Sequence, residues 1–255
     1  MKLATWNINS LNVRLPHVLD WLGKHAPDIV CLQETKLEDA KFPAAALKEA
    51  GYQSVFCGQK TYNGVAILSR EPAADVVKGI AGFEDTQQRV LSATVSGLRV
   101  VCVYVPNGES LESPKFEYKM KWMDALRLWL QQELVAHPKL VVFGDYNVAP
   151  EARDVHDPAQ WENKIHFTGP ERKALHALFA AGLTDAFRLF DQPERSYTWW
   201  DYRMMAFRRK MGLRIDHILL SPALVPLCTA CTIDIEPRRL ERPSDHALVV
   251  AELNV

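Results

Sequence analysis

Carboxylate and amide side chains follow several apolar runs in this sequence. The run 139–143 (KLVVF) is typical of a strand buried on both faces, and Gly144, Asp145 and Asn147 come after it. Side chains two residues apart on a strand point the same way, so we expect Asp145 and Asn147 to share a face. A simple turn needs no charged carboxylate, which makes both residues candidates for chemistry.

The same pattern recurs along the chain. Polar side chains at or near the ends of other apolar runs are Asn7, Glu34, Tyr104, Asn107, Asp216, Asp245 and His246. Asp and Asn are common turn residues, and this alone explains any single case. It explains the whole set poorly, because a charge within a run as apolar as 213–220 costs several kcal/mol unless it is paired or bound to a metal. We therefore expect these residues to converge on one site.

The expected site is rich in oxygen ligands and poor in thiols. Carboxylate and amide oxygens suit a hard divalent cation, Mg²⁺ or Mn²⁺, better than zinc. A hard cation together with several acids, a histidine and a tyrosine hydroxyl indicates hydrolysis of a phosphate ester, because the cation offsets the charge on the phosphate.

The elements that would position these residues alternate along the chain. We expect helices over 14–25, 43–50, 112–136 and 171–181. We expect strands over 2–7, 28–33, 52–57, 63–69, 88–95, 98–105, 139–144, 214–221, 229–235 and 246–253. No linker or low-complexity run divides the 255 residues, so we expect 1–255 to be a single α/β domain with two packed sheets and helices outside. The connections 73–87 and 149–170 are expected to be long loops.

Composition limits the class of protein and of partner. The chain has 30 basic and 31 acidic residues, a net charge of -1. Attraction to a polyanion must therefore come from a local patch. The segment 203–214 is such a patch, since it carries five basic residues and no acid. Basic runs of this kind are usually solvated loops. This run, however, follows an aromatic stretch (SYTWWDY) that could stack on a nucleotide.

No regular spacing relates the five cysteines, which are Cys31, Cys57, Cys102, Cys228 and Cys231. Cys228 and Cys231 have C-x-x-C spacing without a second Cys or His pair, which favours structural thiols over a zinc or redox site. We expect a reducing, cytoplasmic compartment. No segment approaches the ~18 apolar residues of a membrane span, and the start of the chain does not read as a signal peptide.

Seven motifs go beyond these general patterns: TWNINS, LQETK, YVPN, GDYNVAP, WWDYR, GLRIDHIL and ERPSDHA. In this order and at this spacing they resemble the exonuclease III family of DNA-repair nucleases over essentially the whole chain, most of all its bacterial, Neisseria-type members. The resemblance implies a DNase I-like, four-layered α/β sandwich of two packed, mostly antiparallel β-sheets flanked by helices. It also implies Mg²⁺-dependent hydrolysis of phosphodiester bonds in duplex DNA, with Mn²⁺ as a substitute.

The resemblance assigns roles to individual residues. The metal would be held by Asn7, Glu34, Asp145, Asn147, Asp245 and His246. Asp145 would orient or deprotonate the attacking water, and Asn147 would position the same group. His246, paired with Asp216, would contact the scissile phosphate, and Tyr104 would stabilise the developing charge or the leaving oxygen. This agrees with the needs of phosphodiester hydrolysis, which are a base, a cation and help for the leaving group. Which residue is the general base stays open.

DNA contacts are expected beyond the reacting atoms. The candidates are Asn107, His166, Trp199, Arg203, Arg208, Arg209 and Lys210. Relatives that cleave abasic sites tend to have a small residue where His166 stands. A bulky imidazole there would narrow the room for a flipped-out abasic sugar, whereas a surface histidine that touches a neighbour or a phosphate is the alternative.

The sequence therefore predicts a monomeric DNA-repair nuclease that acts on duplex DNA with damaged, nicked or recessed 3' ends. The expected activities are 3'-to-5' exonuclease and 3'-end processing (3'-phosphatase or phosphodiesterase), with abasic-site cleavage reduced by His166. One alternative is a full abasic-site endonuclease, and another is a related phosphoesterase with a non-DNA substrate. A catalytically dead binding module is a further alternative, but the expected metal and catalytic residues are all present.

Overall fold

Apolar runs become strands in the computed structural model, which describes all of residues 1–255. One six-stranded sheet has the order β11-β12-β1-β2-β4-β3, and the other has the order β5-β6-β7-β8-β10-β9. The strands of the first sheet are β1 (Lys2–Asn7), β2 (Ile29–Gln33), β3 (Gln53–Cys57), β4 (Val65–Ser69), β11 (Cys228–Asp234) and β12 (Leu248–Leu253). Those of the second are β5 (Ala73–Lys78), β6 (Val90–Val95), β7 (Leu98–Tyr104), β8 (Leu140–Asp145), β9 (Thr184–Asp185) and β10 (Asp216–Leu220).

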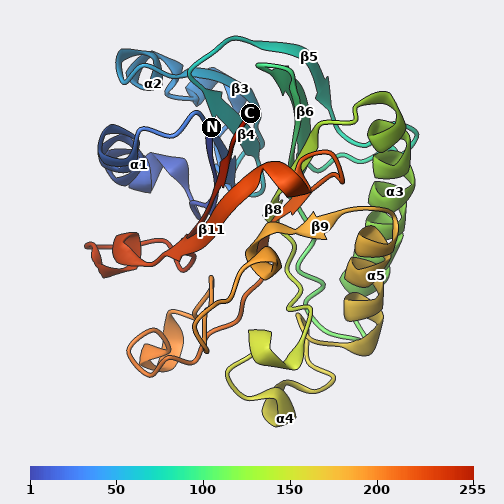
Figure 1. Ribbon diagram of the computed structural model, residues 1–255. Coiled ribbons are helices and arrows are strands. Elements are labelled where there is room, and N and C mark those ends of the chain that lie inside the picture. Colours follow the sequence, from blue (N-terminus) through green and yellow to red (C-terminus); the bar gives the residue numbers. More distant parts are fainter.

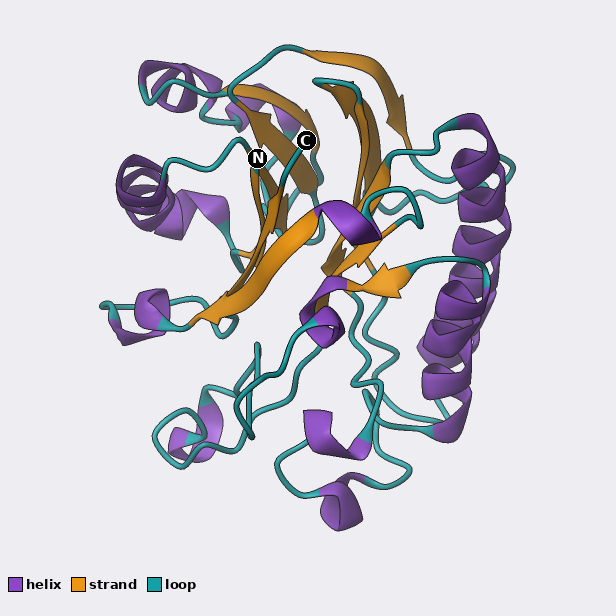
Figure 2. Ribbon diagram, in the orientation of Figure 1, coloured by secondary structure: helices purple, strands orange, loops and turns teal.

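Helices cover the outer face of each sheet, so the molecule has four layers (Figures 1 and 2). The helices are α1 (Leu11–His25), α2 (Ala44–Glu49), α3 (Pro114–Ala136), α4 (Pro158–Trp161) and α5 (Gly169–Ala180). α1 and α2 pack on the first sheet, and α3 and α5 pack on the second. α3 begins as its sequence predicts, because the Ser113 hydroxyl accepts a hydrogen bond from the Lys115 amide and Pro114 takes the first helical position.

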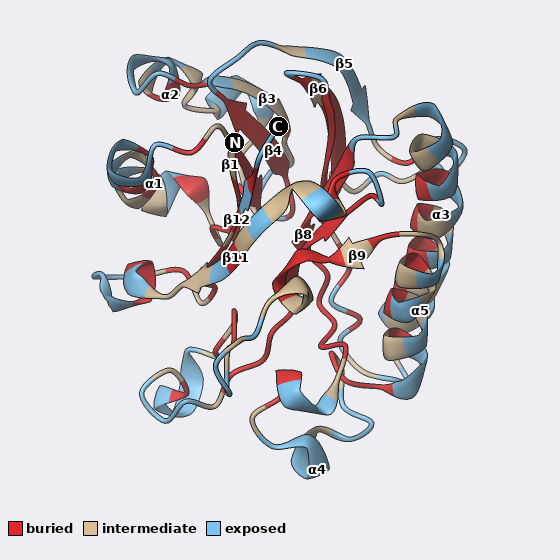
Figure 3. Ribbon diagram, in the orientation of Figure 1, coloured by how far each residue is buried: buried red, intermediate tan, exposed pale blue.

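The main core lies between the two sheets, as the red strands at the centre of Figure 3 show. Leu3 and Ile29 of the first sheet meet Val141 and Phe143 of the second, and all four are fully buried. A second apolar cluster lies under α3 and α5, and a third under α1. The ends of the chain are joined in the first sheet, where Met1 and Leu253 exchange backbone hydrogen bonds.

Strand direction brings the polar strand ends to one edge of the sandwich. β1 and β2 run parallel, and so do β7 and β8, while the other neighbours are antiparallel. Asn7, Tyr104 and Asp145 are the last residues of β1, β7 and β8. Asp216 opens β10 opposite Asp145, because that pair is antiparallel. All these side chains therefore meet at the same end of the two sheets.

The predicted two-sheet sandwich with outer helices is confirmed, but the prediction of loop at 73–87 is wrong over its first part. That segment contains the edge strand β5, which pairs with β6 through an irregular register. None of its six residues is buried. An edge strand exposed in this way needs no apolar run, so periodicity did not reveal it.

The structure also extends and shortens other elements. Strand β10 begins at Asp216 and not at 214, and α5 begins at Gly169, two residues earlier than expected. The loop 149–170 holds the short helix α4 and a single 3-10 turn at Ala152–Asp154. None of the helices combines the length and the apolar character needed to span a bilayer.

Candidate metal and catalytic site

Two carboxylates and an imidazole meet where the two sheets end. Glu34, Asp145 and His246 place their ligand atoms within 4.8 Å of one another. Glu34 follows β2 and Asp145 ends β8, so each sheet contributes one acid. Glu34 has a left-handed backbone with φ of 52°. Such conformations are costly for residues other than glycine and occur often at functional sites.

Asn7 links the two acids. Its amide nitrogen donates to Glu34 Oε1 and to Asp145 Oδ2, each at 2.9 Å. Its amide oxygen accepts the backbone N–H of Asn9. Asn7 thus meets the acids as a hydrogen-bond donor, and the prediction that it ligates a metal stays a prediction.

Asp145 and Asn147 share a site through a turn and not through strand alternation. The strand ends at Asp145, and Asn147 has a left-handed backbone with φ of 51°. The Asn147 amide N–H donates to Asp145 Oδ1 at 2.8 Å, which closes an Asx turn. The side-chain amide of Asn147 lies 3.4 Å from Asp145 Oδ2 and donates to the Val105 carbonyl. The expected proximity is correct, but the expected geometry is wrong because the strand stops before Asn147.

His246 and Asp216 form the expected pair. The Nδ1 atom of His246 lies 2.9 Å from Asp216 Oδ2, and its Nε2 atom lies 3.8 Å from Asp145 Oδ2. Burial by itself would lower the pKa of His246, but the carboxylates of Asp216, Asp145 and Asp245 outweigh it and raise the pKa to about 10. The imidazole is therefore a cation at neutral pH, held by Asp216 on one side.

Asp245 lies outside the three-residue cluster. Its Oδ1 accepts from the Asn9 amide at 2.9 Å, and its Oδ2 accepts from the Trp199 indole at 3.0 Å. Both carboxylate oxygens are thus engaged by neutral donors, so its predicted metal role stays a prediction. Because Asp245 directly precedes His246, these bonds also fix the start of the segment that carries the imidazole.

Tyr104 lies beside the acids as expected. Burial, followed by the negative charges of Glu34 and Asp145, raises the pKa of its phenol well above the usual range. The hydroxyl therefore stays protonated at neutral pH and can donate a hydrogen bond. The guanidinium of Arg89 stacks 4.6 Å from the ring and donates to the Tyr104 carbonyl, which fixes the tyrosine.

A cavity of about 520 Å³ adjoins Asn147, and several predicted DNA contacts line it. They are Asn107, His166, Trp199 and Arg203. Two residues that line this cavity contact Asn147. Asn107 Nδ2 lies 3.4 Å from Asn147 Oδ1, and His166 Nδ1 lies 2.9 Å from the Asn147 carbonyl oxygen. His166 is only 7% exposed and its ring lies 5.7 Å from that of Trp199. The structure thus places His166 in the wall of the cavity and not on the surface.

The basic run is divided between two surfaces. Arg203 pairs with Asp201 at the cavity beside His166. Arg208 and Lys210 line a different cavity with the aromatic rings of Trp200 and Phe207, and Arg209 is exposed. The basic run therefore lies at two separate cavities, and the prediction that these residues contact DNA stays a prediction.

Lys36 contacts the cluster directly, and through Asn9 it is linked to Asp245. Lys36 Nζ lies 2.9 Å from Glu34 Oε2 and also donates to the Asn9 side chain. The only signals in the sequence were the position of Lys36 within LQETK and that of Asn9 within TWNINS. A lysine and an asparagine in short motifs do not indicate on their own which carboxylates they hold.

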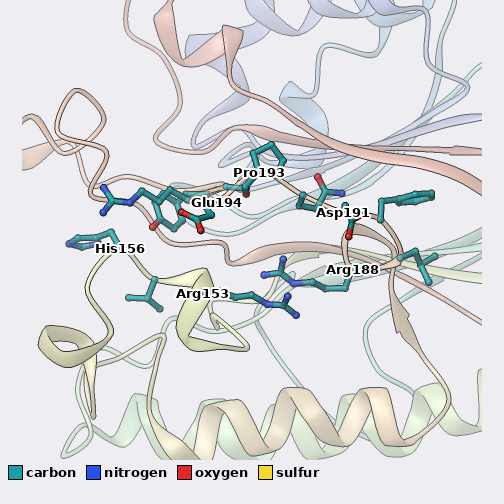
Figure 4. Close-up of a pocket in the computed structure, with 13 residues that line it drawn as sticks. Arg153, His156, Arg188, Asp191, Pro193 and Glu194 are labelled. Carbon is teal, nitrogen blue, oxygen red and sulfur yellow. The ribbon is translucent and has the colours of Figure 1, made fainter.

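A larger cavity lies away from this chemistry (Figure 4). It measures about 980 Å³, and no predicted site residue lines it. Arg153 and Arg188 face it together with Asp191 and Glu194. This cavity is lined by charges of both signs and by none of the predicted site residues. Its size is therefore no reason to place the reaction there.

The donor set fits a hard divalent cation. Asp145 is almost fully buried, and burial raises its pKa to about 7, even though His246 and the Asn7 amide act in the other direction. A buried carboxylate that is this costly to ionise is relieved by a nearby positive charge. Glu34 offers a second carboxylate, and no thiol belongs to the cluster. Such oxygen-rich sites are typical of Mg²⁺ or Mn²⁺.

Comparison with known proteins agrees with this geometry. Residues 4–246 match the Endonuclease/Exonuclease/phosphatase family. The chain belongs to this family. Within it, the chain is 34% identical to Exodeoxyribonuclease III of Haemophilus influenzae, over 99% of each protein. Family members of this kind are metal-dependent hydrolases, so the predicted class of enzyme is confirmed, as are the exonuclease III resemblance and the DNase I-like fold.

Solved structures of family members superpose over the whole chain. The 3'-5' exonuclease NExo from Neisseria meningitidis is 52% identical with a TM-score of 0.98, and full coverage of both chains. A variant of the 3' phosphatase NExo from Neisseria, bound to a product DNA hairpin, is 51% identical with a TM-score of 0.98 and full coverage of both. An AP endonuclease from Archaeoglobus fulgidus is 41% identical with a TM-score of 0.97, again with full coverage. The prediction of a DNA-repair nuclease is thus confirmed at the level of class.

Proposed function

We propose that this member of the family is a Mg²⁺-dependent nuclease that trims and cleans 3' ends of duplex DNA. The observation that carries the proposal is the cluster of Glu34, Asp145 and His246, bridged by the Asn7 amide. The similarity of the whole chain to a Neisseria 3' phosphatase bound to a product DNA hairpin supports DNA as the substrate. The proposed substrates are blunt, nicked or recessed 3' ends, including ends that carry a 3'-phosphate.

In this proposal Glu34 and Asp145 would hold the cation. When bound, the cation would offset the negative charge of the phosphate. Asp145 takes the proton from the attacking water, and the Asn147 turn keeps that carboxylate in place. The imidazolium of His246, oriented by Asp216, contacts the scissile phosphate. The protonated hydroxyl of Tyr104 donates to the 3'-oxygen as its bond to phosphorus breaks.

His166 sets the preference for ends over abasic sites. Its ring is fixed between the Asn147 carbonyl and Trp199, so it cannot swing away cheaply from the cavity wall. We infer that it narrows the cavity to a terminal 3' group and disfavours a flipped-out abasic sugar. The His166→Gly variant is expected to raise the ratio of abasic-site cleavage to 3'-phosphate removal above that of wild type. The absolute rates should fall, because the variant also loses the hydrogen bond from the ring to the Asn147 carbonyl.

Three duplexes test these proposals: one blunt with a free 3'-hydroxyl, one with a 3'-phosphate and one with an internal abasic site. Wild type with Mg²⁺ is expected to process the first two and to cut the third slowly. EDTA should stop every reaction. Absence of cleavage with Mg²⁺ or Mn²⁺ would contradict the enzyme proposal. Full abasic-site activity in wild type, unchanged in His166→Gly, would favour a general AP endonuclease instead.

We also infer a monomer that works in the cytoplasm. All five cysteines are free, which supports a reducing compartment. Apart from the neighbours Val76 and Val77 and the group Tyr202, Met204 and Met205, the large exposed apolar side chains are scattered, as in Leu128 and Leu240, which supports a monomer. Light scattering of the purified protein tests the second inference, and a stable dimer would contradict it.

A further inference from the structure

Lys119 is the one lysine whose side chain is fully buried, and it lies directly beneath the two loops of the site. Its ammonium, on α3, donates to the Asn147 carbonyl at 2.8 Å and to the Asn107 carbonyl at 3.1 Å. Its third contact is with Glu171 Oε1 at 2.5 Å. All three protons of the ammonium are thereby used.

Glu171 is equally buried and is engaged on every side. Its Oε2 accepts from the amide and the hydroxyl of Thr168, which form the capping box at the start of α5. Its Oε1 also accepts the backbone N–H of His166 at 3.2 Å. The buried pair therefore connects α3 and α5 to the loop that carries His166.

The backbone that these contacts hold is unfavourable by itself. Asn147 and His166 both have left-handed backbones, with φ of 51° and 77°. Such conformations persist only where surrounding contacts fix them. The Asn147 carbonyl accepts two hydrogen bonds, one from Lys119 and one from the His166 ring. Loss of the ammonium would leave the Asn147 carbonyl with one donor instead of two and the Asn107 carbonyl without this donor.

We propose that Lys119 is a positioning residue that sets the reactive placement of Asn147 and His166, with Glu171 as its counter-charge. The inference rests on the proposed nuclease function, in which Asn147 keeps Asp145 in place. Lys119 itself touches no reacting atom, since its three contacts are two backbone carbonyls and Glu171. It acts through the geometry of the loops.

A buried ion pair could instead serve folding alone, so the test must separate the two roles. Removal of Lys119 alone would leave the Glu171 charge buried and unpaired and could unfold the protein. The double variant Lys119→Met/Glu171→Gln removes both charges, and its glutamine keeps one acceptor oxygen for the Thr168 cap, while the other side of the amide is an NH2 group. It is expected to melt close to wild type, yet it lacks the anchor of the two carbonyls.

The measurement is steady-state removal of a 3'-phosphate, with melting temperature recorded for each variant. The double variant is expected to lose kcat by about 10- to 100-fold, because small displacements of a catalytic group have effects of that size. KM for the duplex should change less. Lys119→Arg, which keeps a cation and several donors, should recover part of kcat. Lys121→Met on the exposed side of α3 is the control and should match wild type.

Wild-type kcat in a folded double variant would overturn the inference and leave the pair a purely structural one. If wild type itself cleaves no DNA, the proposed function fails, but the inference is still tested by a crystal structure of the double variant. That structure is expected to show Asn147 and the His166 ring displaced from their wild-type positions. Unmoved loops there would also overturn the inference.

Discussion

At the scale of single residues, we propose that Asp145 carries the chemistry, because it is a buried acid at the centre of the cluster. It accepts from Asn7 and from the Asn147 backbone, and it lies 3.8 Å from the His246 imidazole. Asp145→Asn keeps the shape but removes the negative charge. It is expected to lower kcat by roughly 10²- to 10⁴-fold, the usual range for a lost acid–base group.

The same substitution should leave folding and DNA binding largely intact, since a neutral amide is easier to bury than a carboxylate. Thermal melting and binding to a hairpin with a recessed 3' end check these two points. Asp191→Asn is the matched control, because that carboxylate lines the separate cavity of Figure 4. Normal turnover by Asp145→Asn would return the residue to a structural role in its turn.

His166 also makes stability depend on pH. Burial, aided by the positive charge of Lys119, lowers its pKa from the usual 6.5 to about 4. As pH falls below 6.5, the unfolded chain binds a proton at this position that the folded chain does not. As pH falls from 6.5 to about 4, this residue therefore lowers the free energy of unfolding by up to about 1.4 kcal/mol per pH unit. Above pH 6.5 its contribution does not change with pH.

His166→Gln removes that proton-binding difference. The variant should show a flatter decline in unfolding free energy between pH 6.5 and 5 than wild type, while the two proteins differ by a constant amount above pH 7.5. Urea unfolding at a series of pH values, without added metal, checks this. Parallel profiles across the whole range would show that other groups control the acid sensitivity.

At the scale of elements, the contact of β7 with β8 explains why a glycine precedes Asp145. A Cβ on Gly144 would lie 2.0 Å from the Val103 carbonyl oxygen, far inside contact distance. Gly144→Ala must push the two strands apart and is expected to destabilise the protein by roughly 1–3 kcal/mol or more. Gly23→Ala, in α1 with nothing within 4 Å of the added Cβ, should instead be stabilising by about 0.5–1 kcal/mol.

Urea unfolding of the two alanine variants checks this pair of predictions. Because Gly144 adjoins Asp145, its variant should also lose activity at temperatures where it remains folded. An unchanged unfolding midpoint in Gly144→Ala would mean that β7 and β8 can separate without loss of packing. Glycine here serves close strand approach, and its flexibility is not required.

The elements also show what the sequence could predict. Apolar runs located ten of the twelve strands. Most of these are buried in the sandwich core and carry a continuous apolar pattern, although the edge strands β3 and β11 are only partly buried. The edge strand β5 and the two-residue strand β9 carry no such pattern. Polar residues at strand ends predicted the cluster of Glu34, Asp145 and His246, since parallel neighbours end at the same edge.

Other parts of the site were beyond periodicity and motifs. Asn147 reaches its place through a left-handed turn, so strand alternation predicted the right neighbour for the wrong reason. Lys119 and Glu171 lie on two helices far apart in sequence, and nothing in either helix marks its charge as buried. Long-range pairs of this kind depend on how α3 packs against α5, which a single sequence does not specify.

At the scale of the whole molecule, the charge is nearly balanced, so the global field gives little attraction for DNA. Affinity must then come from local basic groups that release counterions from the phosphates. The exposed residues Arg208, Arg209 and Lys210 form such a group on the loop that leads away from the cavity of His166. We expect them to bind phosphates of the duplex at some distance from the 3' end that reacts.

Replacement of Arg208, Arg209 and Lys210 by Gln tests whether charge acts locally. If all three contact phosphates, the slope of log K against log salt for a hairpin duplex should fall by roughly 2–3, since each contact contributes about 0.9. KM should rise while kcat stays near wild type, because the cluster of Glu34, Asp145 and His246 is untouched. The control replaces Lys121, Lys139 and Lys173 by Gln, which changes net charge equally on the exposed surface around α3 and α5. An equal loss of affinity in both triple variants would mean that net charge, and not a defined surface, attracts the DNA.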